Sequence, residues 1–456
     1  MLIQFSVSNF LSFNEKETFS MTAGKSRKNI DRIFNNKKVK LTKCEVIFGA
    51  NASGKSNLVY AFRFVQQMLV NGLPRNFSNK YFRMNSNKKN TPSEFEIVFL
   101  CDSKTFVYSF SIILSTGSIL KEDLYERSSQ TSIKKLFSRD TVSETFNVGN
   151  YFKKETSFSK LRNYGEDSVN DQETLFLSLI NKNKGKMFSD VPELQILRDV
   201  FKWFKDKLTI SFPTSILTGY PYFTNANLNE ISELLNALGT GISALKIVQV
   251  PEEVAKSKIP DELFNKVVTR LEKANAHAET PAINPPKIVV RSYKEFYTLE
   301  MDSDNKLIIT TIEFSHENNT TFFHLDEESD GTARLLDLID ILFKISDNKI
   351  FVIDEIDRCL HPSMTVKIIE LFLKMATQRN TQLIITSHES RLLASEMLRN
   401  DEICFVTKAK DGSSIINPLE KYQLRADKKV YAALFDGFLS DAVPAFNDKK
   451  LAKFLN

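Results

Sequence analysis

The chain has 456 residues, 42% of them hydrophobic, and four widely spaced cysteines without a C-x-x-C pair. This length predicts two or three domains with substantial cores, and the cysteines indicate reduced residues of a cytoplasmic protein rather than a disulfide framework. No apolar stretch reaches membrane-spanning length and the first twenty residues alternate as a strand does, so we expect neither a membrane anchor nor a signal peptide.

The net charge of +5 is unevenly distributed along the chain. Residues 1–90 contain 16 Lys+Arg and 4 Asp+Glu, a balance of +12, which leaves 5 − 12 = −7 for the remaining residues. A basic first lobe of this kind can contact nucleic acid, an acidic partner or the phosphates of a nucleotide. It can equally be an ordinary solvated surface, and the charge alone does not distinguish these alternatives.

An alternating strand over residues 2–13 opens the chain, and a phosphate loop follows. Gly49–Ser56 fits the pattern G-x-x-x-x-G-K-[ST] and lies between a predicted strand at 44–48 and a predicted helix at 57–70. This strand, loop and helix form the context that the motif requires. The glycines let backbone N–H groups point at phosphate oxygens, and the positive end of the helix favours an anion. The alternative is a glycine-containing turn in front of a helix.

The motif predicts a site for ATP and Mg²⁺. Lys55 is expected to reach the β- and γ-phosphates, and the Ser56 hydroxyl to ligate the metal. The predicted nucleotide-binding residues are Gly49, Asn51, Ala52, Ser53, Gly54, Lys55, Ser56 and Asn57. A second Gly-Lys-Ser at 24–26 has Phe19 in the place of the first glycine, so we expect no phosphate loop there.

Residues 1–125 are expected to form the N-terminal lobe of an ATPase head, with strands at 95–100, 105–114 and 119–125 as an antiparallel subsheet. Residues 126–286 are expected to form an inserted, mainly helical domain. Their helical periodicity is interrupted by loops and shows no sustained heptad pattern, so a long coiled-coil arm is excluded. The helices are predicted at 173–181, 193–207, 229–238 and 261–276.

The C-terminal lobe of the head is expected at 287–420, followed by a tail at 421–456. Strand-like segments at 288–325 lead into Glu328–Thr332, with a helix predicted at 331–345. Ser329 and Gly331 place a hydroxyl and bare backbone amides at the start of this helix, where an anion can dock. Taken alone, the same pattern is an ordinary helix cap, and its position ahead of the next motif favours a nucleotide contact.

Two buried strands end in polar residues. The apolar run 350–353 predicts a strand of a parallel sheet, and Asp354 and Glu355 follow it at the edge where α/β folds bind ligands. Asp354 can bind the Mg²⁺ held by Ser56, and Glu355 can polarise the water that attacks the γ-phosphate. The strand 382–386 likewise delivers His388, which can hydrogen-bond the γ-phosphate or the attacking water.

These motifs, in this order and around a large insertion, resemble an ABC-type ATPase head of the SMC and RecF kind. The resemblance implies an α/β phosphate-loop fold with a mixed sheet, an antiparallel subsheet and an inserted helical domain. The resemblance covers about residues 1–125 and 285–440. Five stretches carry a narrower resemblance: Asn9–Phe13, Glu328–Thr332, Ile353–Asp357, Leu360–Pro362 and Leu398–Ile403. They resemble those of compact ATPases of bacterial anti-phage systems, such as AbiLi, RloA and the AriA subunit of PARIS, which are related to the ATPase half of OLD nucleases.

The chain departs from the ABC pattern at two places. The glutamine with which many ABC proteins sense Mg²⁺ is not evident, and Glu122 is only a weak substitute. Thr332 stands where the ABC signature usually has glutamine.

The resemblance implies that two protomers meet head to tail, as a dimer or within a higher oligomer. Ser329 and Gly331 of one would then cap the γ-phosphate bound to Lys55 of the other. ATP would hold the protomers together, and hydrolysis assisted by Glu355 would release them.

Three functions fit these expectations. The first is the ATP-hydrolysing scaffold and sensor of an anti-phage system. This scaffold would hold a separate nuclease-type effector, encoded nearby, until a phage trigger arrives. The 456 − 388 = 68 residues after His388 are too few for a fused Toprim nuclease. The second is an SMC/RecF-like repair ATPase that binds DNA through its basic lobe, and the third is a nucleotide-gated interaction module with negligible turnover.

Overall fold

The computed structural model describes all residues except 37, 129–131, 183–184, 214–227, 277–286, 293, 303, 317–319, 344–348, 396, 423–429 and 436–456. The chain divides into two compact units. The head unit comprises Met1–Ile210, Ile345–Ile356 and Ile369–Asn456, and the insertion unit comprises Ser211–Lys344 and Asp357–Ile368.

The head unit contains a six-stranded sheet in the order β11-β17-β18-β5-β19-β20. Its strands are β5 (Cys44–Phe48), β11 (Leu208–Ser211), β17 (Ile350–Ile353), β18 (Gln382–Thr386), β19 (Ile403–Lys408) and β20 (Ser414–Pro418). The four central strands β17, β18, β5 and β19 run parallel. Every residue of β5, β17 and β18 is buried, as expected for strands covered on both faces.

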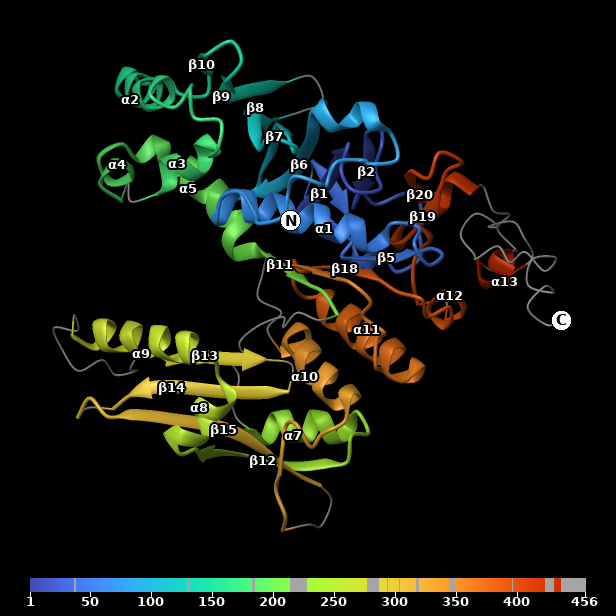
Figure 1. Cartoon of the computed structure of the whole chain (residues 1–456). Coiled ribbons are helices and arrows are strands. Elements are labelled where there is room, and N and C mark those ends of the chain that lie inside the picture. The colour runs from blue at the N-terminus through green and yellow to red at the C-terminus, as the bar shows by residue number, and fades with distance from the viewer. Residues whose placement is uncertain are drawn as a thin grey trace. The chain divides into compact units, whose positions relative to one another are not determined.

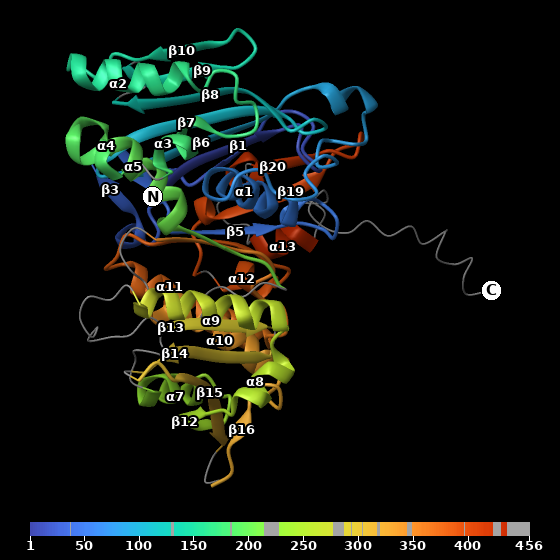
Figure 2. The ribbon, with the colours of Figure 1, turned by 60° about the vertical axis from the view of Figure 1, so that its left-hand side comes forward.

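A seven-stranded antiparallel sheet in the order β10-β9-β8-β7-β6-β1-β2 completes the core of the head unit. Helix α1 (Lys55–Val70) lies between the two sheets (Figures 1 and 2) and stacks Phe62 on Phe5, with ring centroids 4.0 Å apart. The antiparallel strands are β1 (Leu2–Ser8), β2 (Glu17–Ser20), β6 (Ser93–Cys101), β7 (Lys104–Ile113), β8 (Ser118–Arg127), β9 (Ile133–Asp140) and β10 (Thr145–Val148). The predicted subsheet is therefore present, and it extends beyond residue 125.

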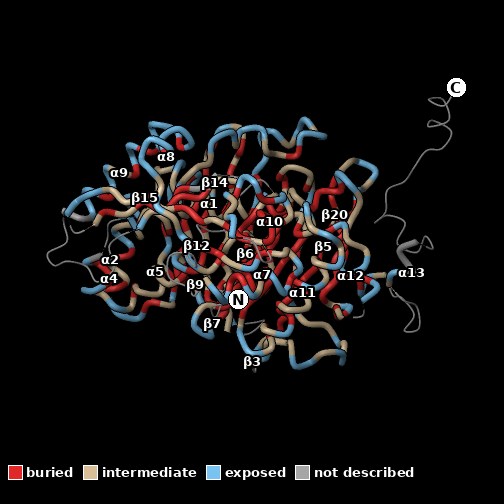
Figure 3. The backbone as a smooth tube through the Cα atoms, turned by 90° about the horizontal axis from the view of Figure 1, so that it is seen from below, coloured by how far each residue is buried: buried red, intermediate tan, exposed pale blue. Residues whose placement is uncertain are grey.

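Short elements cover these sheets. The helices are α2 (Glu155–Glu166), α3 (Phe176–Asn181), α4 (Gly185–Asp190), α5 (Gln195–Lys202), α12 (Arg391–Ala394) and α13 (Val430–Phe435), and β3 (Phe34–Asn36) pairs with β4 (Val39–Leu41). A π-helical turn, η4, occupies Trp203–Lys207. The remaining single turns are η1 (Ile30–Arg32), η2 (Ser86–Asn90), η3 (Pro192–Leu194), η5 (Asn400–Glu402) and η6 (Leu419–Tyr422). In Figure 3 many buried residues lie along the strands, and exposed residues lie along outer loops and along helices such as α8 and α9.

The insertion unit is built on a five-stranded antiparallel sheet, in the order β12-β15-β14-β13 with β16 paired to β15. Its strands are β12 (Ile242–Gln249), β13 (Lys287–Ser292), β14 (Glu295–Met301), β15 (Leu307–His316) and β16 (Phe323–His324). Its helices are α7 (Leu228–Ala237), α8 (Glu252–Lys258), α9 (Asp261–Ala276) and α10 (Asp330–Phe343), and α11 (Pro362–Ala376) crosses the boundary between the units along the chain. Phe264 and Leu271 of α9 are buried against Tyr297 and Leu299 of β14.

The division into units differs from the boundaries expected at 125 and 286. Residues 133–148 and the helices α2–α5 belong to the head unit, while strands β13–β16 join the insertion unit. The reason is long-range pairing: β12 pairs with β15, so segments from both sides of residue 286 share one sheet. The expected tail 421–456 lies outside the described residues except for 421–422 and 430–435. Among the described helices, none is long and apolar enough to cross a membrane.

Candidate nucleotide site

The strands of the head unit bring the predicted catalytic residues to one edge of the parallel sheet. Ile353 of β17 lies opposite Ile385 of β18, which in turn lies opposite Val46 of β5. The three strands therefore end together. Gly49–Ser56 and Asp354 follow these ends, at the position where parallel α/β sheets bind ligands.

Both glycines of the phosphate loop are required by its backbone. Gly49 has φ = +151° and Gly54 has φ = +112°, backbone angles that residues other than glycine rarely adopt. A Cβ at Gly49 would lie 2.2 Å from the carbonyl oxygen of Val406, and a Cβ at Gly54 would lie 2.0 Å from Ser414 Oγ. The loop thus packs closely on β19 and β20.

Two serines outside the motif support the end of the loop. Ser414 Oγ of β20 donates to the carbonyl oxygen of Ser53 and lies 2.7 Å from Ser12 Oγ. Asn57 Nδ2 of α1 donates to Ser12 Oγ at 2.7 Å. Neither supporting serine is among the predicted site residues. Ser12 could have been found, because it lies in the Asn9–Phe13 stretch, whereas nothing in the sequence links residue 414 to residue 53.

Lys55 lies across the start of the loop. Its Nζ donates to the carbonyl oxygens of Gly49 at 2.8 Å and Ala50 at 3.1 Å, and the side chain is buried. Helix α1 begins at Lys55 and has no acidic residue in its first turn. The positive helix end and the ammonium group therefore face the same loop, which favours a phosphate.

Thr386 orders the two carboxylates that follow β17. Its Oγ1 donates to Asp354 Oδ1 at 2.6 Å and accepts from the backbone N–H of Glu355 at 2.7 Å. Asp354 and Thr386 are both buried. Glu355 is only partly buried and has φ = +46°, an uncommon conformation for a residue with a side chain. Thr386 thus holds Glu355 in a strained backbone conformation, and it is not among the predicted site residues.

His388 lies at the same edge, two residues after β18 ends, and is exposed. The turn that carries it is fixed by a hydrogen bond from the backbone N–H of Glu389 to Ser387 Oγ, 3.0 Å long. The structure therefore brings the phosphate loop, Asp354, Glu355 and His388 together in the head unit.

The predicted signature residues lie in the insertion unit. Ser329 is the N-cap of α10, and its Oγ accepts a hydrogen bond from the backbone N–H of Thr332 at 3.0 Å. Ser329 is exposed. A Cβ at Gly331 would lie 2.9 Å from the carbonyl oxygen of Cys359, so a larger residue would disturb this loop. The cap interpretation is correct for Ser329, and a contact with phosphate stays a prediction.

A comparison with known families shows which family the chain belongs to. A family model described as "AAA domain, putative AbiEii toxin, Type IV TA system" matches residues 46–394. The chain belongs to this AAA domain family. The match contains the phosphate loop, the signature loop and the strands β17 and β18, and with the observed sheets it agrees with the expected α/β phosphate-loop fold.

Solved SMC heads are similar to the AAA domain protein at low identity. The SMC head bound to the C-terminal winged-helix domain of ScpA is 14% identical, with a TM-score of 0.42 and coverage of 91% of this chain and 96% of that chain. The SMC head domain from Thermotoga maritima is also 14% identical, with a TM-score of 0.33 and coverage of 91% and 98%. No curated protein matches the chain.

The residues of this AAA domain fit ATP and Mg²⁺. Ser56 and Asp354 supply hydroxyl and carboxylate oxygens, the ligand type that Mg²⁺ prefers. Gly49 and Gly54 both have positive φ, as the tight backbone of a phosphate loop requires. Both observations support the assignment of these residues as the nucleotide and metal site.

Glu122 does not have the free position that a metal-sensing residue needs. It is fully buried, and its carboxylate lies 3.4 Å from Arg139 Nη2 and accepts hydrogen bonds from Tyr108 Oη and the backbone N–H of Leu177. Burial raises the pKa of Glu122, and Arg139 opposes that rise. Glu122 therefore joins β8, β9 and α3 inside the head unit, and this buried position fits its description as only a weak substitute for the glutamine.

The second Gly-Lys-Ser, at 24–26, is held by hydrogen bonds to residues 399 and 401. The backbone N–H of Gly24 donates to Asp401 Oδ2 at 2.7 Å, and Arg399 donates to the carbonyl oxygen of Ser26 at 3.0 Å. Arg399 also binds Asp401 through two nitrogens, at 2.7 and 2.6 Å. The Leu398–Ile403 stretch thus anchors an N-terminal loop of the head unit.

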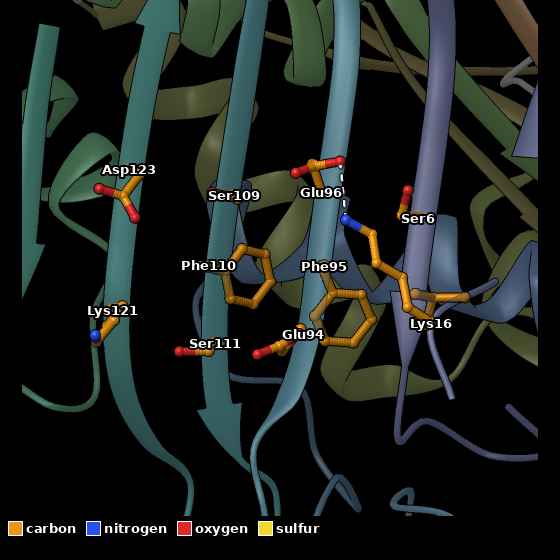
Figure 4. A pocket seen from close by; sticks show the side chains of 11 residues that line it. Ser6, Lys16, Glu94, Phe95, Glu96, Ser109, Phe110, Ser111, Lys121 and Asp123 are labelled. Carbon is orange, nitrogen blue, oxygen red and sulfur yellow. Dashed lines mark hydrogen bonds and ion pairs between the residues drawn. The ribbon is translucent and has the colours of Figure 1, made fainter. Parts of the chain in front are cut away.

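A separate pocket of about 210 Å³ lies on the face of the antiparallel sheet that points away from α1 (Figure 4). Glu96, Ser109 and Asp123 stand side by side on neighbouring strands, and Lys16 forms an ion pair with Glu96 at 3.2 Å. No lining residue belongs to the phosphate loop or follows β17 or β18. This pocket is therefore distinct from the nucleotide site within the described residues.

Proposed function

We propose that this AAA domain protein is the ATP-binding and ATP-hydrolysing scaffold or sensor of a bacterial anti-phage, abortive-infection system. The observation that carries the ATPase part is the arrangement of the phosphate loop, Asp354 and Glu355 at one edge of a parallel sheet. The defence part is supported by the family description, which refers to a toxin–antitoxin system, and by the resemblance to anti-phage ATPases in the motifs described above.

The residues of the head unit can perform hydrolysis as follows. Lys55 and the loop amides would bind the phosphates, and Ser56 and Asp354 would hold Mg²⁺, which would supply positive charge to neutralise the charge that develops on the phosphates. Glu355 orients a water molecule and accepts its proton as the water oxygen attacks the γ-phosphorus and ADP leaves. Thr386 fixes the backbone at Glu355, so its carboxylate starts near the required position. His388 is proposed to hydrogen-bond the γ-phosphate.

ATP would control association of two protomers. Each chain carries a phosphate loop in one unit and an exposed Ser329 at the start of α10 in the other. In a head-to-tail dimer, Ser329 and Gly331 of one protomer would cap the γ-phosphate held by Lys55 of its partner. Association would therefore need ATP, and hydrolysis would reverse it. We propose that this cycle controls a separate Toprim or nuclease-type effector in response to a phage-encoded trigger, in the cytoplasm.

A second candidate is an SMC/RecF-like ATPase that binds DNA. It is favoured by the charge of +12 over residues 1–90, where exposed basic residues include Lys25, Arg27, Lys28, Lys38, Lys40, Arg75 and Arg83. Stimulation of hydrolysis by DNA, with a steep loss at higher salt, would support this function.

Native mass spectrometry distinguishes the defence scaffold from the DNA-binding ATPase. The sample is tagged Glu355→Gln protein, expressed from its own operon and purified with ATP and Mg²⁺. A homo-oligomer that carries a second protein chain would support the defence scaffold and identify its effector. A dimer that holds DNA and no second protein would support the repair function. Lys55→Ala protein, purified in the same way, is the control and should stay monomeric.

A further inference from the structure

The signature loop, Glu328–Thr332, is held from the insertion sheet by a lysine. Lys294 lies in the turn between β13 and β14, and its Nζ donates to the carbonyl oxygen of Glu328 at 2.7 Å. The same Nζ lies 3.1 Å from Asp330 Oδ1. Lys294 therefore binds the residues on both sides of Ser329 and fixes the direction in which the Ser329 hydroxyl and the first amides of α10 point.

A histidine of the same sheet holds the loop at a second point. His316 is the last residue of β15, and its Nε2 lies 2.8 Å from Glu328 Oε1. The Glu328 side chain is only 5% exposed, so its carboxylate depends on partners within the protein. An imidazole with a proton on Nε2 can donate to this carboxylate in its neutral or charged form.

Both contacts come from one end of the sheet. Strands β14 and β15 are antiparallel, with Thr298 opposite Thr310, so the start of β14 and the end of β15 lie at the same end. Movement of this end would displace both neighbours of Ser329 together. Lys294 and His316 both bind the signature loop from this end of the sheet. The geometry of the loop therefore depends on the position of the sheet end and not on that of α10 alone.

We propose that Lys294 and His316 are positioning residues for the signature loop, and that this end of the insertion sheet controls ATP-driven association. The inference rests on the proposed head-to-tail dimer for its functional consequence. The insertion unit would then have a regulatory role. A partner that displaces the turn at Lys294 would weaken the dimer without contacting the phosphate loop.

The test compares Lys294→Ala, Lys294→Arg and Lys287→Ala in the Glu355→Gln protein. Lys287 is the matched control, because it forms an ion pair with Glu300 at 2.8 Å on the same sheet but starts β13, away from the turn. We expect Lys294→Ala to weaken ATP-dependent dimerisation about tenfold or more, since charge-assisted hydrogen bonds are lost. ATP affinity of the protomer should be unchanged, Lys287→Ala should behave as the parent, and Lys294→Arg should recover most of the dimer.

Hydrogen exchange of the peptide covering 325–333 provides a measurement that needs no dimer. It should be faster in Lys294→Ala and His316→Ala than in Lys287→Ala, and His316→Gln should restore protection because an amide can donate to Glu328. Equal exchange and equal dimerisation in Lys294→Ala and Lys287→Ala would overturn the inference. A parent protein that exchanges as expected but stays monomeric with ATP would refute the proposed dimer and leave the positioning role supported.

Discussion

Replacement of Thr386 by valine tests how the catalytic edge is held. Valine has the same shape as threonine and fits the fully buried position, but it cannot donate to Asp354 Oδ1 or accept from the N–H of Glu355. The substitution therefore removes the two hydrogen bonds and leaves the sheet intact. Glu355, with φ = +46°, loses the acceptor that holds its backbone in a strained region.

The expected loss of stability is about 2–4 kcal/mol, since one hydrogen bond goes to a carboxylate and the other leaves a backbone N–H without its acceptor. The expected fall in kcat is about 10–100-fold, because a catalytic group displaced by about 1 Å loses rate on this scale. ATP affinity should change little, since Thr386 has no part in the phosphate loop.

Urea unfolding and phosphate release, each compared with Thr365→Val, would measure both effects. Thr365 is also fully buried, but its Oγ1 has no hydrogen-bond partner among the described residues, so the control should be neutral or slightly stabilising. If both variants had the same unfolding midpoint and the same kcat, the positioning role of Thr386 would be refuted.

Four further outcomes are expected. Glu355→Gln should bind ATP and accumulate as a dimer while kcat falls about 100-fold or more, and normal phosphate release would refute its role as the base. Lys55→Ala should lose ATP binding in a fluorescent-nucleotide titration, and tight binding would contradict the phosphate-loop assignment. Burial raises the pKa of Glu402 from 4.5 to about 7. Between these pH values the folded protein holds a proton that the unfolded chain releases. The free energy of unfolding should therefore fall by up to about 3 kcal/mol as pH rises from about 4.5 to 7. Glu402→Gln should remove that slope in urea titrations, whereas an unchanged slope would assign it to other groups. Trp203 is the single tryptophan of the chain and lies in the π-helical turn. Gln66 of α1 donates to Phe204 O in this turn and to Leu208 O directly after it, so ATP binding should alter tryptophan emission in the parent protein and should alter it less in Gln66→Ala.

The local elements around the nucleotide site were predictable because each depends on a few adjacent residues. The apolar run before Gly49 is strand β5, and the helix after it begins at Lys55, two residues before the predicted start. Likewise, the strands before Asp354 and His388 have the predicted type and place. A buried strand of a parallel sheet has a distinctive apolar sequence, and a phosphate loop has a nearly fixed spacing.

The missed features depend on contacts between distant residues. Strand β9 contains two lysines, an arginine and an aspartate, so its sequence does not resemble a buried strand; Arg139 is tolerated there because Glu122 neutralises it. The pairing of β12 with β15, which sets the boundary of the insertion unit, joins segments about sixty residues apart. No local pattern encodes such a pairing.

The order of strands in the parallel sheet has a consequence for synthesis of the protein. Strand β5, which leads into the phosphate loop, lies between β18 and β19, and β18 begins 382 − 48 = 334 residues after β5 ends. A nascent or truncated chain that lacks these strands would leave both edges of β5 unpaired. It also could not supply Asp354, which follows β17. Nucleotide binding would thus become possible only after β17, β18 and β19 had been synthesised, and a partner that recognises the ATP-bound form would not bind shorter nascent chains.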